Sequence, residues 1–137
     1  IMTPKMVEVA QHPKVKLMTY SEVEEVSGYV GNFKVKIKKK ASYVNRDICT
    51  GCGLCSEKCP AKAASEFDEG LAERPAIYTP FPQAVPNKPV LDREHCTYFL
   101  KDGKCGICAK ICPLSCIDYE QEATIEEDGS GSMSIHY

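Results

Sequence analysis

The sequence predicts an α+β fold in which a cysteine-rich unit carries an N-terminal β-hairpin extension. Two short segments, residues 47–60 and 92–118, hold all nine cysteines of the 137-residue chain. Residues 33–38 alternate apolar and basic side chains with the period of two that is typical of a β-strand. Residues 3–13 carry the start and stop signals of a short helix. The length allows one domain, or a domain with an appendage.

The N-terminal helix is predicted from its capping residues. Thr3 is a capping residue type, Pro4 suits the first helical position, and the helix should end before Pro13. Residues 15–20 are rich in apolar and β-branched side chains and are expected to form a strand.

A β-hairpin is predicted within residues 22–40, where Gly31 and Asn32 form a turn signal. The apolar side chains of its second strand should face inward: Phe33, Val35 and Ile37. Five lysines accompany them, at positions 34, 36, 38, 39 and 40. These lysines could dock an acidic partner. A solvated strand face that also prevents edge-to-edge pairing is the more ordinary interpretation, and we favour it.

Composition argues against several classes of function. With 17 basic and 19 acidic residues the net charge is −2, which gives no sign of nucleic-acid binding. No apolar run is long enough to span a membrane, and the N-terminus lacks a signal-peptide pattern. We therefore expect a cytoplasmic protein whose cysteines bind metal rather than form disulfides. The GSGS sequence near the C-terminus is typical of an engineered linker, so residues 129–137 are excluded from the fold prediction.

The first cysteine segment has a spacing that is specific to iron–sulfur proteins. In CTGCGLCSEKCP, residues 49–60, the cysteines are separated by two, two and three residues, and a proline follows the last. This is the signature of bacterial ferredoxins, in which the fourth cysteine binds the other of two clusters. CGICAKICP, residues 105–113, matches residues 52–60 at five of nine positions. Two copies of one unit predict a dicluster bacterial ferredoxin-like module with a pseudo-two-fold arrangement.

The spacing also indicates where each thiolate should point. A [4Fe–4S] cube takes four thiolates, and three cysteines at this spacing let a loop wrap one cube. Gly51 and Gly53 let the backbone pass close to the sulfurs, where N–H groups can donate to them. Cys59 follows a short helical turn that Pro60 ends, so its thiolate should point toward the second cube.

Eight of the nine cysteines are assigned in this way to two [4Fe–4S] clusters. The first cluster is expected to bind Cys49, Cys52, Cys55 and Cys112. The second is expected to bind Cys59, Cys96, Cys105 and Cys108. Eight residues separate Cys96 from Cys105, and the turn dipeptide Asp102-Gly103 predicts a small hairpin loop that brings the chain back to the cluster.

Two further residues are candidates for this ligand set. Cys116 remains after the assignment and could be a redox or alternative ligand, but a small buried apolar residue is the usual role of a free cysteine. His95 could replace Cys96 as a ligand, although a histidine beside such a motif is usually unbound.

Zinc and a catalytic cluster are the alternatives to an electron-transfer pair. Four-cysteine zinc sites pair two C-x2-C units across a gap, whereas here three cysteines are consecutive at this spacing and the C-P ending occurs twice. Two sets of four thiolates leave no iron open to substrate, and no GxGxxG loop, paired carboxylates or catalytic triad is present. The module alone is expected to transfer single electrons and to catalyse no bond chemistry.

The segment between the cysteine repeats is predicted to be a connector. In residues 75–92 the prolines at 80, 82, 86 and 89 exclude a helix and a central strand. We expect an extended connection over a small core, and favour it over a proline-rich ligand for another domain. Residues 66–74 could hold one helical turn.

Several segments outside the first cysteine motif resemble one known family. Similarity to the A-type iron–sulfur flavoprotein of heterodisulfide reductase is found in TPKMVEVAQHP, TYSEVEEVSGYVGNFKVKI, EFDEGLAERPAIYTPFPQAVP and REHCTYFLKDGKCGICAKICP. Together with the first motif, the resemblance covers most of residues 2–122. Two of these segments are long and are not explained by ferredoxin chemistry, so the resemblance is specific.

The resemblance implies a dicluster ferredoxin domain inserted in a thioredoxin-reductase-type flavoprotein, which takes part in flavin-based electron bifurcation in methanogens and related anaerobes. Residues 1–46 would be the edge of the flavin domain, residues 47–122 the dicluster domain, and residues 123–128 a return strand. Since the flavin fingerprint is absent here, FAD would belong only to the parent protein. Residues 1–20 lack their family context and should be less ordered than residues 43–122.

The family also implies a role and partners. The module would relay electrons between a flavin and an external redox partner. Its partners would be the other heterodisulfide reductase subunits, ferredoxin, or a hydrogenase or dehydrogenase. A free-standing dicluster ferredoxin is the alternative, and the flavoprotein-like flanks argue against it.

Overall fold

The computed structural model describes residues 1–128, and the expected engineered linker at residues 129–137 lies outside this range. The chain divides into two units. One combines Ile1–Lys16 with Ser42–Glu120, and the other combines Leu17–Ala41 with the segment from Gln121 onward. Helices and strands are mixed along the chain, which confirms the α+β class. Within the described range, no helix is long and apolar enough to cross a membrane.

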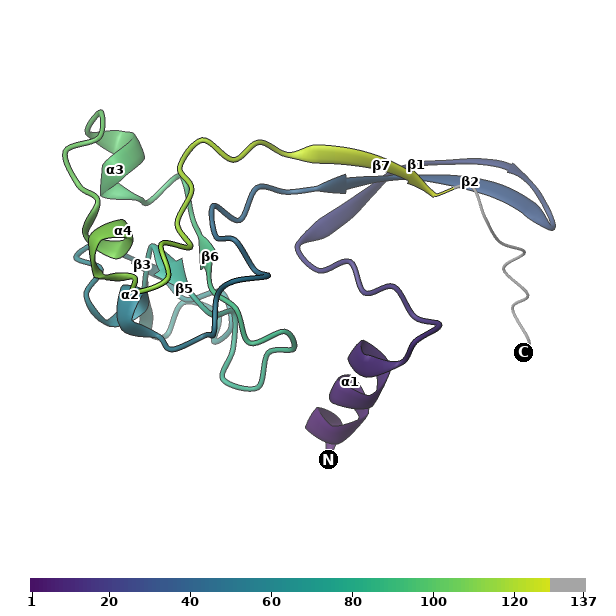
Figure 1. The fold of residues 1–137 in the computed structure, drawn as a ribbon, viewed down its shortest axis with the longest axis horizontal. Helices are drawn as coiled ribbons and strands as arrows, with labels where there is room; N and C mark the ends of the chain where they lie inside the picture. The colour runs from purple at the N-terminus through teal and green to yellow at the C-terminus, as the bar shows by residue number, and fades with distance from the viewer. Residues whose placement is uncertain (129–137) are drawn as a thin grey trace. The chain divides into compact units, whose positions relative to one another are not determined.

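The larger unit consists of short elements that surround the cysteines. In chain order these are α1 (Met2–Gln11), α2 (Leu54–Glu57), β3 (Lys62–Ala64), β4 (Glu73–Pro75), β5 (Ile77–Tyr78), β6 (Val90–Leu91), α3 (Thr97–Leu100) and α4 (Ile107–Ile111). β3 pairs with β4, and β5 pairs with β6, both antiparallel. Helices α2 and α4 each lie inside one cysteine repeat and contact each other (Figure 1). The two copies of the repeat therefore meet through corresponding helices.

The apolar core of this unit is small. Apart from cysteines, its buried apolar side chains are Tyr43, Val44, Ala63, Ala76, Ile77, Ala84, Val90 and Leu91. Three cysteines are also buried: Cys96, Cys108 and Cys116. Because so few large apolar side chains are buried, hydrophobic burial alone provides limited stability to a unit of this size.

A buried arginine holds the two ends of the proline-rich segment together. Arg74 in β4 is 7% exposed, and its guanidinium stacks 3.8 Å from the centroid of the Tyr78 ring. It donates to Glu66 (2.6 Å from Nε to Oε2) and to Asp92 (2.8 Å). These hydrogen bonds, to Glu66 first, raise the pKa of Arg74, and the bond from Arg74 lowers the pKa of Glu66. The backbone N–H of Asp92 also donates to Ala76 O at 2.7 Å.

The helical turn suggested for residues 66–74 is wrong. Glu69 and Gly70 have positive φ (58° and 84°), which a right-handed helix does not allow. The N–H of Gly70 donates to the carbonyl of Ser65 at 2.7 Å, so the segment closes the turn between β3 and β4. The proline-rich segment that follows forms no helix, and only the two-residue strands β5 and β6 pair across its ends.

The second unit contains a three-stranded antiparallel sheet (Figure 1). Its strands are β1 (Ser21–Tyr29), β2 (Asn32–Lys39) and β7 (Thr124–Asp128), in the order β1-β2-β7. Tyr29 pairs with Asn32, so the hairpin turn is Val30-Gly31 rather than the expected Gly31-Asn32. Gly31 has a φ of 87°, which places the residue that tolerates this conformation at the second turn position.

The lysines of β2 do not protect a sheet edge, because β2 is the central strand. Lys36 lies opposite Glu25 of β1, with 3.2 Å between the ammonium nitrogen and a carboxylate oxygen. Lys40 forms an ion pair with Glu22. Charge pairing across the strands thus explains part of the lysine run. The apolar side chains expected to face inward are half-buried: Phe33, Val35 and Ile37.

The predicted N-terminal helix is confirmed, with corrected boundaries. Helix α1 begins at Met2, its N-cap is Ile1 without a side-chain cap, and Thr3 lies inside it. The strand expected at residues 15–20 is absent, and β1 begins at Ser21. A strand needs a partner, and the pairing with β2 starts only at Ser21.

The amides of α1 should exchange their hydrogens faster than those in the cysteine-bearing part of the same unit. None of the 10 residues of α1 is buried, and an isolated helix of this length is marginal in water. We expect little protection of the amides of residues 2–11. The amides of Asn45 and Asp118, which donate to backbone carbonyls at 2.7 and 3.0 Å, should exchange slowly. Native-state exchange read by mass spectrometry checks this, and strong protection throughout residues 1–20 would contradict it.

Candidate metal centres

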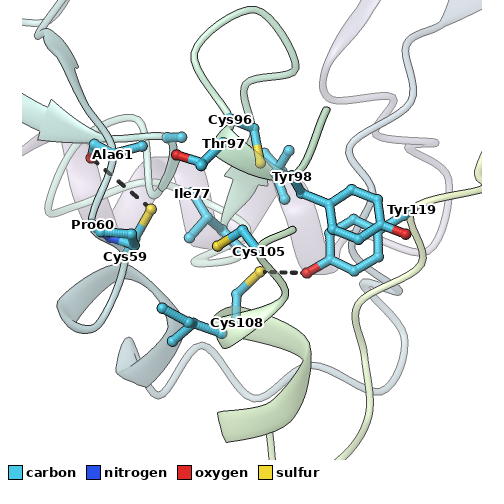
Figure 2. A pocket seen from close by; sticks show the side chains of 13 residues that line it. Cys59, Pro60, Ala61, Ile77, Cys96, Thr97, Tyr98, Cys105, Cys108 and Tyr119 are labelled. Atoms are coloured by element: carbon cyan, nitrogen blue, oxygen red, sulfur yellow. Dashed lines mark hydrogen bonds between the residues drawn. The ribbon is translucent and has the colours of Figure 1, made fainter. Parts of the chain in front are cut away.

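Four thiols from both cysteine repeats line one hollow (Figure 2). They are Cys59, Cys96, Cys105 and Cys108. Cys59 follows α2, Cys96 is the N-cap of α3, and Cys108 lies in α4, so three helices direct their sulfurs toward a common space. The other lining residues are mainly apolar, and Ile77 and Leu91 from the paired strands β5 and β6 form part of the wall.

A second hollow is lined by five thiols. They are Cys49, Cys52, Cys55, Cys112 and Cys116. The first three belong to the first cysteine motif, where α2 begins, and Cys112 is the C-cap of α4. Each repeat therefore contributes one cysteine to the hollow of the other repeat, Cys59 in one direction and Cys112 in the other.

The thiols fall into the two groups that the spacing suggested, while the binding of a cluster to each group stays a prediction. Among the described residues, no carboxylate or imidazole lines either hollow. The donor set is therefore one of soft sulfur ligands in apolar surroundings, which suits iron–sulfur clusters. His95, the alternative ligand, lies outside both linings and its Nδ1 is 2.8 Å from Asp92.

The insert between Cys96 and Cys105 is a helical turn rather than a small hairpin. It forms α3, and the chain then reverses at Asp102 and Gly103, whose φ angles are 47° and 79°. The N–H of Gly103 donates to the carbonyl of Tyr98 at 2.9 Å and closes the reversal. Both flanking cysteines therefore reach the same hollow.

Burial makes several of these thiols resist ionisation. Burial is the largest cause that raises the pKa of Cys55, Cys96 and Cys108, and neighbouring cysteines raise it further. For Cys112 burial acts in the same direction, but N–H donors led by that of Cys116 outweigh it and lower the pKa. Thiolates crowded in this way need positive charge nearby, and a metal centre supplies it because its ligands bind as thiolates.

Hydrogen-bond donors approach sulfurs in both hollows. The backbone N–H groups of Gly51 and Cys116 donate to Cys49 Sγ and Cys112 Sγ, each at 3.4 Å. The hydroxyl oxygen of Tyr119 is 2.9 Å from Cys108 Sγ and donates when that sulfur is a thiolate. The sequence suggested that glycines would allow N–H contacts, but it gave no signal for Tyr119, which lies eleven residues from Cys108.

The proline-rich segment packs on the loop of the first cysteine motif. The Lys88 ammonium donates to the carbonyl of Cys49, and Pro89 lines the hollow. Gly51 is so close to Asn87 that an added Cβ would lie 2.3 Å from the Asn87 carbonyl oxygen. The connector thus touches the first hollow directly, and Gly51 is required for its close approach.

Cys116 lines the first hollow and is held both through its backbone and through contacts of its thiol with Cys112 and Cys49. It is 2% exposed, its N–H donates to Cys112 Sγ, and its carbonyl accepts from the N–H of Asn45 at 2.7 Å. Burial, with hydrogen bonding to Cys112, raises the pKa of the Cys116 thiol to about 11. These contacts favour a structural role.

Comparison with known proteins shows which family the chain resembles. A model described as a 4Fe–4S binding domain matches residues 42–65, which include the first cysteine motif. The chain is 50% identical over 122 residues to the A-type iron–sulfur subunit of CoB–CoM heterodisulfide reductase from Methanocaldococcus jannaschii, covering 89% of this chain and 18% of the relative. Over most of its length the chain is similar to the A-type subunits of heterodisulfide reductases. The chain is also 51% identical to a protein from Archaeoglobus profundus that is named as similar to this heterodisulfide reductase subunit. That match covers 86% of this chain and 19% of the relative.

Another member of the family is the A-type subunit of the H2:CoB–CoM heterodisulfide, ferredoxin reductase from Methanothermobacter thermautotrophicus. It is 47% identical over 135 residues, or 98% of this chain and 20% of the relative. The chain thus spans about a fifth of the length of the family members that it matches. The second cysteine repeat lies outside the matched domain model, so the prediction that it binds a cluster rests on its own residues and their spacing.

Gly51→Ala should destabilise the protein more than the matched variant Gly53→Ala. Both glycines have positive φ (74° and 81°), where a side chain costs about 1–2 kcal/mol. A Cβ at Gly53 meets nothing within 4 Å, whereas one at Gly51 clashes with Asn87. We expect a loss in unfolding free energy of about 1–2 kcal/mol for Gly53→Ala and of about 3 kcal/mol or more for Gly51→Ala. Anaerobic urea unfolding, followed by circular dichroism, measures both, and equal losses would refute the role of the Asn87 contact.

Cys116→Ala should leave metal content unchanged, whereas Cys112→Ala should lower it. Alanine keeps the N–H that donates to Cys112 Sγ, so the first hollow should still hold its metal. Loss of the Cys112 thiolate should remove about half of the iron, since the second hollow keeps its four thiols. Iron analysis of the two purified variants tests this. Equal iron loss in both would identify Cys116 as a ligand, and full iron in Cys112→Ala would exclude Cys112.

Proposed function

We propose that this chain is an electron-transfer module with two [4Fe–4S] clusters. In this proposal Cys49, Cys52, Cys55 and Cys112 hold one cluster, and Cys59, Cys96, Cys105 and Cys108 hold the other. A bound cluster would supply one-electron transfer from a donor to an acceptor, and these thiolates would hold it in place. The protein positions the clusters and the partners, and by itself it catalyses no bond chemistry.

The observation that carries the proposal is the exchange of one cysteine between the two hollows. Cys59 of the first repeat lines the hollow of the second, and Cys112 of the second lines the hollow of the first. This crossing is the known ligand pattern of two-cluster bacterial ferredoxins. A zinc staple needs no such crossing, because each of its sites is usually made from two local C-x2-C pairs.

The surroundings of the thiols support electron transfer rather than catalysis. With four thiols in one hollow and five in the other, every iron of a cube can take a protein ligand and none remains open to substrate. The walls are largely apolar, and contact between α2 and α4 connects the two sites through adjoining backbone. The apolar walls would limit the access of water to each cluster, although Cys52 at the first hollow is exposed.

The family suggests where the electrons come from and go. Relatives are named as A-type subunits of heterodisulfide reductases, and one of these enzymes as a heterodisulfide, ferredoxin reductase. We propose that the module relays single electrons between a flavin of the parent protein and an external redox partner within a heterodisulfide reductase-type, electron-bifurcating complex. FAD would bind the parent protein rather than these residues. Other reductase subunits, ferredoxin, or a hydrogenase or dehydrogenase would be the partners, in the cytoplasm.

Metal and sulfide content should decide between the proposal and a zinc staple. The chain, purified without oxygen, should contain about eight irons and eight sulfides, and its brown absorbance should bleach with dithionite. A variant with Cys49 and Cys52 changed to alanine should keep about four irons, since the second hollow contains neither residue. About two zincs and no colour would overturn the proposal. About four irons in the unchanged chain would limit it to one cluster.

A further inference from the structure

We propose that Tyr119 sets the reduction potential of the second cluster, by donating a hydrogen bond from its hydroxyl to the Sγ of Cys108. This inference rests on the proposed function, because it assumes that Cys108 binds a cluster. Tyr119 would be a positioning residue, since it acts through a ligand and does not bind metal itself.

The contact is short and lies inside the hollow. The Tyr119 oxygen is 2.9 Å from Cys108 Sγ, and both residues line the hollow that Cys59, Cys96 and Cys105 share (Figure 2). Cys108 is 8% exposed, so little water competes for its sulfur. A thiolate can only accept a hydrogen bond, which makes the phenol the donor once metal is bound.

Aromatic packing fixes the position of the hydroxyl. The Tyr119 ring stacks on that of Tyr98, with centroids 3.7 Å apart and planes 9° from parallel. Phe99 meets both rings edge-on, at 6.0 Å from Tyr119 and 5.5 Å from Tyr98, and Tyr43 packs against Phe99 at 4.9 Å. Gly103 lies against the ring of Tyr98, since an added Cβ at Gly103 would be 3.7 Å from that ring.

The backbone supports the same residue independently. Ile117 pairs with Val44 in an antiparallel bridge, and the N–H of Asp118 donates to the carbonyl of Tyr43 at 3.0 Å. Tyr119 is thus held by ladder contacts just before it and by ring packing along its side chain. Because the hydroxyl is already held in position, no further conformational entropy is lost when it donates to the more negative form of the sulfur.

The direction of the effect follows from charge. One-electron reduction makes the cluster and its ligand sulfurs more negative, so a donor to sulfur stabilises the reduced form more than the oxidised form and raises the potential. No tyrosine is among the residues that line the first hollow, where the donors to sulfur include the backbone N–H groups of Gly51 and Cys116 and the side chain of Ser56. The two sites therefore differ in their hydrogen-bond donors, and removal of one hydroxyl should affect only the second.

Tyr119→Phe tests the inference, with Tyr98→Phe as its matched control. Both substitutions keep the stacked rings, but only the first removes the hydroxyl beside Cys108. In EPR-monitored titrations one of the two potentials should fall in Tyr119→Phe, and neither should move in Tyr98→Phe. We expect the ratio of reduced to oxidised cluster at a fixed potential to drop about three- to tenfold, and tenfold corresponds to about 59 mV for one electron.

A second measurement reports the hydrogen bond itself. Pulsed ENDOR of the reduced protein in heavy water should show an exchangeable deuteron near the cluster, and this coupling should be lost in Tyr119→Phe alone. Iron content separates the two proposals. If all three proteins contain about eight irons but their potentials and couplings are identical, the role of Tyr119 is refuted and the electron-transfer function stands. If the unchanged chain contains no iron, the proposed function fails first.

Discussion

The rest of the larger unit depends on the convergence of thiols at two points, four at one and five at the other. Its apolar core consists of alanines and only a few larger side chains, so little else holds the loops in place. Crowded thiols in apolar walls repel one another when ionised and resist losing their protons, as the raised pKa values of Cys55 and Cys96 indicate. The arrangement becomes favourable when a metal centre takes the protons' place, and this couples folding to metal binding.

The other features of the unit serve this convergence. The bridge between Val44 and Ile117 joins the start of the cysteine-bearing segment to its end, and so brings the two repeats to one place. Arg74 ties the ends of the proline-rich segment through Asp92 and Tyr78. The segment can then lie over the first cysteine loop, where Gly51 leaves space for its backbone. The contacts of Arg74 thus help to position the segment that packs beside the first hollow, although Arg74 does not line that hollow.

The sequence predicted the grouping of the thiols because the short spacing between the cysteines restricts where their side chains can lie relative to one another. Three cysteines at intervals of three residues must surround a common point, and Pro60 must end the turn that redirects Cys59. It could not predict Tyr119, since its contact with Cys108 depends on where α3 places Tyr98. The strand expected at residues 15–20 is absent for a related reason, because a segment rich in apolar and β-branched side chains gives no information about whether a partner strand exists. The prediction that the lysines of β2 protect a sheet edge is wrong because β7 pairs with the edge of β2 that β1 leaves open. The order of segments along the sequence does not show this pairing.

The crossing of Cys59 and Cys112 has a consequence for biosynthesis. A chain leaves the ribosome from its N-terminus, and many small metal sites can be completed as soon as a local motif has emerged. Here the second thiol group lacks a member until Cys108 has been made, and the first group lacks one until Cys112 has been made. Both sites are therefore completed within four residues of each other, after nearly the whole unit has been translated. Until then, the five thiols from Cys49 to Cys96 are exposed to oxidation and to competing metals, so the unit depends on a reducing environment during its own synthesis.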